Sequence, residues 1–417
     1  MTDISERIAA TYARIAEVDR PEVWITLREQ GSVVAEAAAV ADRVAAGEPL
    51  PLAGRLFAVK NNIDVAGVPT TAACPAFGYE PSADAVAVAR LRGAGAVVLG
   101  STNLDQFATG LVGTRSPYGA VRHAYAPERI SGGSSSGSSV AVALGLVDFA
   151  LGTDTAGSGR VPAALHGLYG IKPSLGLLPT AGVVPACRSI DVVTAMAADL
   201  GLARQAVAVM AGTPLPPTAT LAGPMTIAVP QPGQLGDLAP GWAEAFDAAV
   251  SRSAERGAEL VPVDIEPFLA LARRLYEGAF VAERYAAVGP FIDAHLDEVD
   301  PVVGQIISKA GEIPAWQLFD DLERREACRL LSQALFTKAD ALLLPVTVMH
   351  PTLAEVAADP FGVNATMGRF TNFVNLLDQA AIAVPAGSVD GLPFGVQLIG
   401  PAGSDNRLAD LSSLVAA

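Results

Sequence analysis

Short apolar segments that alternate with helix-like segments most constrain the fold of this 417-residue chain. Residues 55–60 and 95–100 have the length and the continuous apolar character of buried strands, and residues 84–91 between them have helical spacing. Strands that alternate with helices are typical of layered α/β proteins, so we predict an α/β fold. Further helices are predicted over 3–18, 22–47, 138–146, 240–256, 267–297, 313–335 and 406–415, and further strands over 340–345 and 394–399.

Charge and targeting features exclude several classes of function. The net charge is −15 and no cluster of Lys or Arg interrupts it, which argues against nucleic acid as a partner. Three cysteines are too few and too scattered for a disulfide framework. The first residues lack the order of a signal peptide, and no apolar stretch reaches the ~20 residues of a membrane span. We therefore expect a cytoplasmic protein with no membrane partner.

Lys60 stands out because it ends an apolar segment in a chain with only 4 lysines against 24 arginines. An amine that is removed from water loses its proton readily, whereas a guanidinium stays protonated. Lys60 is therefore a candidate base, a role that arginine could not fill.

Two loops rich in glycine and serine follow, over residues 132–137 and 152–158. Small residues flank Ser158, so backbone N–H groups there can approach a substrate oxygen closely. We predict that the N–H groups of Thr155, Ala156, Gly157 and Ser158 form an oxyanion hole, in which losing one donor typically costs about 3–4 kcal/mol.

The first loop also fits two other motifs. Its spacing matches a phosphate-binding loop, but Ser138 stands where that motif requires lysine. The loop also matches the nucleophile-elbow pattern, which would make Ser135 the nucleophile and His350 the candidate histidine base. A nucleophile elbow follows a buried strand, however, and residues 126–130 before the loop are a poor strand. A flexible turn is the structural alternative.

Lys60, the Gly-Gly-Ser-Ser of the first loop and the Gly-Thr-Asp-Thr-Ala-Gly-Ser-Gly-Arg of the second resemble the amidase signature family in order and spacing. Segments 100–107, 170–174 and 392–400 fit the same family, so the resemblance covers nearly the whole chain. It implies a mixed central β-sheet covered by helices on both faces, amide hydrolysis without a cofactor, and a homodimer.

The resemblance also implies a Ser-cisSer-Lys triad. Ser158 is expected to be the nucleophile and Lys60 the ultimate base. Ser134, joined to Gly133 by a cis peptide bond, is expected to relay the proton between them.

Three charged residues lie near the triad in the sequence. Asp154 and Arg160 flank Ser158 closely, so we expect them to form an internal network that supports the loop. Lys172 lies in a turn before a proline and is expected to be structural.

Further segments resemble the allophanate hydrolase subgroup, namely 70–75, 106–119, 185–189 and 371–378. Allophanate is a urea that carries a carboxylate, and arginine matches the geometry of a carboxylate. Tyr276 and Arg284 lie eight residues apart in the helix predicted over 267–297, so they would share a face and bind substrate. The resemblance implies that the substrate is this small anionic amide and the product ammonia, as in urea degradation and nitrogen metabolism.

Three other functions stay open at this stage. They are a broad-specificity carboxamide amidase, the amidase subunit of a tRNA-dependent amidotransferase, and a non-catalytic binding protein on an amidase scaffold. The acidic balance disfavours the amidotransferase, and the intact triad residues disfavour the binding protein. No metal is expected, because the four histidines lack ligand spacing: His123, His166, His295 and His350.

We predict one domain over residues 1–417, with a boundary between lobes near 212–225. Allophanate hydrolases usually carry a second domain after the amidase part, and we expect that domain to be absent here, because the chain stops at Ala417.

Overall fold

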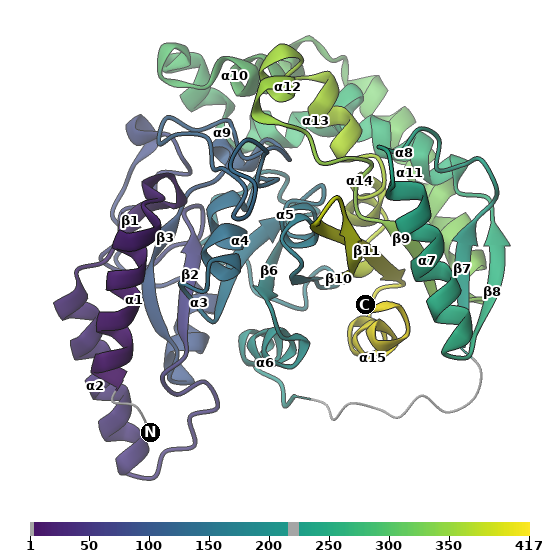
Figure 1. Ribbon diagram of the computed structural model, residues 1–417. Helices are drawn as coiled ribbons and strands as arrows, with labels where there is room; N and C mark the ends of the chain where they lie inside the picture. Colours follow the sequence, from purple (N-terminus) through teal and green to yellow (C-terminus); the bar gives the residue numbers. More distant parts are fainter. Residues whose placement is uncertain (1–3, 216–224) are drawn as a thin grey trace.

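An 11-stranded sheet forms the centre of the computed structural model, which describes residues 4–215 and 225–417 (Figure 1). The strand order is β1-β3-β2-β4-β6-β5-β10-β11-β9-β7-β8. The pairs β2/β3, β2/β4, β7/β8 and β7/β9 are parallel and the other neighbours are antiparallel, so the sheet is mixed. The prediction of an α/β fold with a mixed sheet is confirmed.

The strands span β1 (Trp24–Leu27), β2 (Leu56–Lys60), β3 (Val97–Thr102), β4 (Phe149–Asp154), β5 (Tyr169–Lys172), β6 (Val192–Ala197), β7 (Met225–Pro230), β8 (Ala258–Val263), β9 (Ala341–Pro345), β10 (Ala380–Val389) and β11 (Leu392–Gly400). The α-helices span α1 (Ile4–Val18), α2 (Gln30–Ala45), α3 (Val86–Gly93), α4 (Ser136–Ala143), α5 (Arg160–Leu165), α6 (Leu200–Ala211), α7 (Trp242–Glu255), α8 (Glu266–Glu277), α9 (Ala282–Ala294), α10 (Pro301–Ser308), α11 (Ala315–Phe336), α12 (Leu353–Ala358), α13 (Gly362–Met367), α14 (Asn372–Leu376) and α15 (Asp405–Val415).

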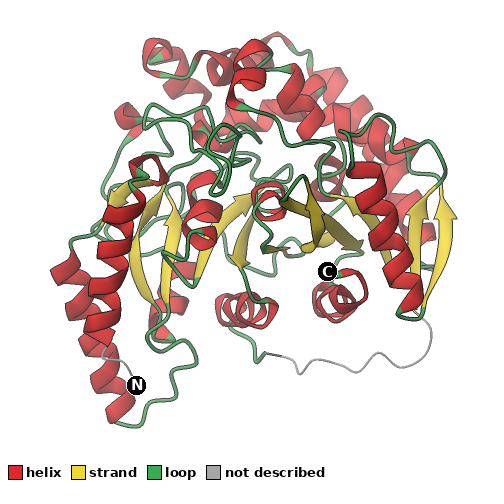
Figure 2. Cartoon of the chain, viewed as in Figure 1, coloured by secondary structure: helices red, strands yellow, loops and turns green. Residues whose placement is uncertain are grey.

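Both faces of the sheet are buried, and strand β9 shows how. Ala341 and Leu343 belong to one apolar core, while Leu342 and Leu344 belong to another. Because successive side chains of a strand point to opposite faces, the two cores lie on the two sides of the sheet. Helices α7 and α15 contribute to the first core and α8 and α14 to the second, so helices cover both faces (Figure 2).

Most of the helices and strands predicted from the sequence occur, with ends within about three residues of the prediction. The helix predicted over 22–47 is wrong at its start, because residues 24–27 form strand β1, which pairs with the edge of β3. Its sequence, Trp-Ile-Thr-Leu, is aromatic and β-branched, as strands favour, and Glu29 precedes the true helix α2.

The helix predicted over 267–297 is also wrong, because two helices, α8 and α9, occupy that range. The break falls at Gly278, whose backbone is extended. The buried carboxylate of Asp321 on α11 accepts hydrogen bonds from Arg274 Nε at 2.8 Å and from the N–H of Ala279 at 2.7 Å. A Cβ on residue 278 would lie 2.5 Å from this carboxylate, so glycine is required at the break.

The boundary predicted near 212–225 falls largely on residues 216–224, which lie outside the described residues. Helix α6 ends where that segment begins, with Gly212 in the left-handed conformation at φ 70°. Among the helices that the structure describes, none combines the length and the apolar character that crossing a bilayer requires.

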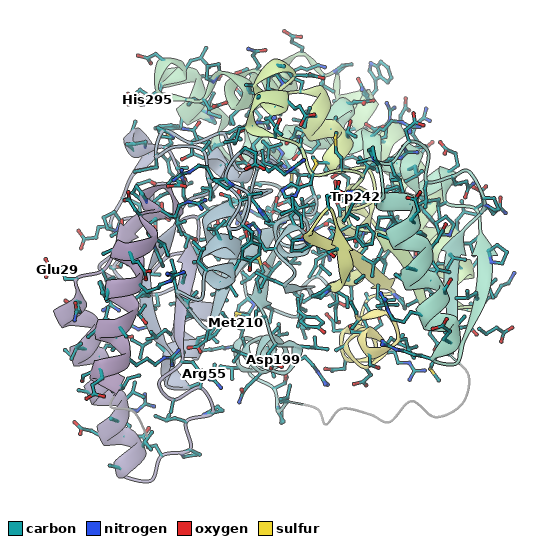
Figure 3. All side chains as sticks on the ribbon, in the orientation of Figure 1. Glu29, Arg55, Asp199, Met210, Trp242 and His295 are labelled. Atoms are coloured by element: carbon teal, nitrogen blue, oxygen red, sulfur yellow. The ribbon has the colours of Figure 1, made fainter. Side chains whose placement is uncertain are left out.

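Three of the four histidines pack together in the interior. The rings of His123 and His166 stack with centroids 4.2 Å apart, and His350 meets His123 edge-on at 4.7 Å. Each ring bonds a backbone carbonyl: those of Leu165, Pro162 and Ile130. The fourth histidine, His295, lies at the periphery with its side chain 42% exposed (Figure 3). Burial lowers the pKa of His123 to about 4 and that of His350 to about 3, and it lowers the pKa of His166 well below the ordinary value.

We expect acid to destabilise the protein through this cluster. The pKa of an unfolded histidine is about 6.5, so between that pH and the lower folded values the unfolded chain binds more protons than the folded one. The stabilisation is complete above about pH 6.5 and falls with pH, by about 2 kcal/mol for each of His123 and His350 at pH 5. Urea unfolding at pH 7 and pH 5 measures the loss.

The variant His350→Gln removes one buried ring and should lose less stability on acidification than the native chain. The variant His295→Gln is the matched control, since its ring is exposed, and should behave like the native chain. Equal pH dependence in all three proteins would contradict the assignment.

Candidate active site

The parallel strands β2 and β4 end side by side, so Lys60 and the second serine loop lie together at the carboxyl ends of these strands. Val59 of β2 pairs with Leu151 of β4, so Lys60 at the end of β2 faces the last residues of β4. The carboxyl ends of neighbouring parallel strands are a common position for active sites. Lys60 Nζ lies 2.7 Å from Thr153 Oγ1 and 2.7 Å from Ser134 Oγ.

Lys60 is fully buried, and its surroundings favour the neutral amine. Burial lowers the pKa of its ammonium to about 7, against the opposing charges of Asp105, Asp154 and Asp191, which raise it. A substantial fraction of the amine is therefore unprotonated at neutral pH, as a base requires.

The peptide bond between Gly133 and Ser134 is cis, as the resemblance implied. The carboxylate of Asp105 lies against it: a Cβ on residue 133 would be 2.1 Å from Asp105 Oδ2, so only glycine fits. That carboxylate also accepts hydrogen bonds from the N–H groups of Val112, Gly113 and Arg115. Asp105 thus ties the first serine loop to the neighbouring segment.

The two serine loops are in direct contact. The N–H of Ser135 donates to the carbonyl of Ser158 at 3.2 Å, which places Ser158 beside Ser134 and Ser135. The hydroxyl of Ser158 lies 3.4 Å from the carbonyl of Gly110. The hydroxyl of Ser135 is engaged by the backbone of Thr153, at 3.2 Å to its carbonyl and 3.3 Å to its N–H, which suits a structural residue better than a nucleophile.

The predicted oxyanion hole needs one correction. The N–H of Gly157 already donates to Asp154 Oδ1 at 2.8 Å, because that carboxylate closes the turn. Within the described residues, the N–H groups of Thr155, Ala156 and Ser158 have no hydrogen-bond partner. These three donors are therefore available to a substrate oxygen, and Gly157 is not.

Asp154 and Arg160 form a fully buried ion pair behind this loop. Arg160 Nε lies 2.9 Å from Asp154 Oδ2, and Arg160 Nη2 lies 3.0 Å from Oδ1. Burial alone would raise the pKa of Asp154, but the charge and hydrogen bonds of Arg160 bring it down to about 2. Asn375 and Gln397 satisfy further donors of Arg160, so the charge is buried with its partners.

Tyr276 and Arg284 meet, but not by sharing one helix face. Tyr276 lies on α8 and Arg284 on α9, and the break at Gly278 turns one helix toward the other. Arg284 Nη2 donates to the Tyr276 hydroxyl at 3.0 Å, and the guanidinium lies 5.0 Å from the centre of the Tyr276 ring. Arg284 Nη1 donates to Thr109 Oγ1 at 2.9 Å, next to the Gly110 carbonyl that Ser158 approaches.

The structure adds two residues to the site that the sequence had not indicated. Thr153 contacts Lys60 directly, and Asp191 accepts a hydrogen bond from the hydroxyl of Thr155 at 2.6 Å. Recognising residues 149–154 as a strand parallel to 56–60 would have placed the end of that strand, where Thr153 lies, near Lys60. No local pattern marks Asp191, which comes from another part of the chain.

Comparison with known proteins agrees with this arrangement. The family model described as Amidase matches residues 6–409. The chain therefore belongs to the amidase family.

Individual relatives show which members of the family the chain is similar to. The chain is 46% identical over 386 residues to the urea amidolyase of Saccharomyces cerevisiae, covering 88% of this chain and 21% of that protein. It superposes on a structure of Kluyveromyces lactis allophanate hydrolase with a TM-score of 0.92 at 40% identity, covering 100% of this chain and 70% of the other. A glutamyl-tRNA(Gln) amidotransferase subunit from Symbiobacterium thermophilum is 33% identical, over 97% of this chain and 91% of that protein. The chain therefore spans about a fifth of the length of the urea amidolyase that it matches.

Proposed function

We propose that this chain hydrolyses allophanate and releases ammonia. The observation that carries the substrate assignment is the state of Arg284, which is 1% exposed. In the described part of the chain, no carboxylate forms an ion pair with it, and its Nε has no hydrogen-bond partner. A buried cation without a counter-ion is costly, so a ligand that brings a carboxylate is favoured here.

The geometry near Ser158 supports the chemistry that would follow. Tyr276 and Arg284 hold the carboxylate, and the carbamoyl carbonyl then meets the N–H groups of Thr155, Ala156 and Ser158. Ser158 Oγ attacks the carbonyl carbon, and its proton passes through Ser134 to Lys60. The negative charge that develops on the carbonyl oxygen is stabilised by donors that are already in place.

The tetrahedral intermediate then collapses. Lys60 returns the proton through Ser134 to the departing nitrogen, the C–N bond breaks, and ammonia leaves an acyl group on Ser158. Water attacks this ester while the same relay removes a proton from it. The bond to Ser158 Oγ breaks and the product leaves with two carboxylates on one nitrogen.

We expect Arg284→Gln to lower kcat/KM for allophanate by about 10²-fold, because a charge-assisted pair with the substrate carboxylate is lost. Hydrolysis of malonamide, which is neutral, should change little. Ammonia release from both substrates measures the two effects, and malonate binding followed by calorimetry should weaken in parallel.

Arg329→Gln is the matched control, because Arg329 is exposed on helix α11, where it pairs with Glu326, and its replacement should leave both activities unchanged. Faster turnover of malonamide than of allophanate by the native chain would refute the substrate assignment. It would leave amide hydrolysis in place and favour a broad-specificity amidase.

A further inference from the structure

The peptide that joins Ala156 to Gly157 is held at both of its polar ends. Its carbonyl accepts a hydrogen bond from Thr371 Oγ1 at 2.6 Å, and its N–H donates to Asp154 Oδ1 at 2.8 Å. Thr371 comes from the segment just before α14, more than two hundred residues further along the chain. Its side chain is fully buried.

This peptide lies between two of the N–H groups that we propose for the oxyanion hole. The N–H of Ala156 precedes it and the N–H of Ser158 follows it, so the torsions at Ala156 and Gly157 set the angle between these donors. Gly157 has no side chain and a φ of 116°, and glycine offers little resistance to rotation. The hole therefore depends on contacts from outside the loop.

Thr371 lies where it can restrain the peptide between Ala156 and Gly157. A Cβ on residue 157 would lie 2.3 Å from Thr371 Oγ1, which shows how closely the threonine packs on the glycine. The side-chain amide of Asn372 is best satisfied in the orientation in which its nitrogen donates to the carbonyl of Ala156 at 2.8 Å and to that of Gly368 at 3.2 Å. In that orientation the Ala156 carbonyl accepts hydrogen bonds from both Thr371 and Asn372.

Arg160 contacts both residues that hold this peptide, Asp154 and Thr371. It forms the ion pair with Asp154, which holds the N–H end of the peptide, and its Nη2 donates to the carbonyl of Thr371 at 3.1 Å. Asp154, Arg160 and Thr371 therefore form one buried connection around the Ala156–Gly157 peptide.

We propose that Thr371 is a positioning residue for the oxyanion hole: without touching substrate, its hydroxyl fixes the peptide that sets the direction of the Ala156 and Ser158 N–H groups. The inference deepens the proposed function, since it concerns the hole at which the amide carbonyl would react. It applies to any amide that Ser158 attacks.

The test is Thr371→Val, which keeps the shape of the side chain and removes the hydroxyl. We expect kcat/KM to fall by roughly 10- to 100-fold, less than the ~10²–10³-fold loss typical of deleting a donor outright. Affinity for methylboronic acid should fall by the same factor, because Ser158 Oγ adds to its boron while the hydroxyl proton passes through Ser134 to Lys60, which gives a tetrahedral boronate anion in the hole. Malonate affinity should not change, and Thr371→Ser should restore the native values.

Thr366→Val is the matched control, because that hydroxyl donates to the Gly362 carbonyl within α13. A merely structural Thr371 would instead lower malonate and boronate affinities together, along with the melting temperature. Native values of kcat/KM and boronate affinity in Thr371→Val would also overturn the proposal. If allophanate is not the substrate, the native chain fails to hydrolyse it, yet the boronate comparison still decides the role of Thr371.

Discussion

Replacing Ser158 by alanine is expected to lower kcat by on the order of 10⁴- to 10⁶-fold, because no acyl-enzyme can form without its hydroxyl. The oxyanion donors and the Tyr276–Arg284 pair would remain, so malonate should still bind with native affinity. Ammonia release from allophanate measures the first effect and calorimetry the second.

Ser139→Ala provides the control for this experiment. Ser139 is also buried, but its hydroxyl donates to the Ser136 carbonyl within helix α4 and faces no reacting group. It should retain activity within a few-fold of the native chain. A near-native rate in Ser158→Ala would refute the mechanism, whatever the substrate.

Replacing Lys60 by methionine is expected to lower kcat/KM by at least about 10³-fold, because the proton of Ser158 then has no acceptor. In the native chain, kcat/KM should fall about tenfold for each pH unit below about 7. The rate falls toward low pH because the protonated amine of Lys60, which predominates there, cannot accept a proton. A pH–rate profile on a pH-stable substrate such as malonamide gives the midpoint.

Lys172→Met is the matched comparison. Lys172 is the other fully buried lysine in the described residues, and burial lowers its pKa to about 8. Its Nζ donates only to the carbonyls of Pro173 and Gln379, so its loss should reduce stability and leave the acid limb near pH 7. An acid limb that stays near pH 7 when Lys60 is replaced by arginine would contradict the assignment of Lys60.

Local chemistry made part of this site predictable. Lys60 could be found because a lysine at the end of a buried strand is rare, and the loop around Ser158 because small residues allow close approach to its backbone. The α/β fold followed from short apolar strands that alternate with helices, whereas the mixed character of the sheet followed from the family resemblance. These features depend on neighbours in the sequence, which the sequence displays directly.

The rest depended on contacts between distant segments. The break at Gly278 is set by a carboxylate on α11, so helical spacing alone predicted one helix where there are two. The engagement of the Gly157 N–H follows from the position of the Asp154 side chain, which composition does not reveal. Thr371 approaches Ala156 only after the chain has passed from β4 through β5, β6, β7, β8 and β9.

The break at Gly278 also separates two tasks within the molecule. Lys60, Ser134 and Ser158 lie on the sheet edge and its loops, whereas Tyr276 and Arg284 lie on α8 and α9, whose relative angle depends on Asp321. A change at this break would move Tyr276 and Arg284, which we propose hold the substrate, and would leave the proposed triad of Lys60, Ser134 and Ser158 in place. A scaffold built in this way can acquire a new specificity by remodelling one helical corner.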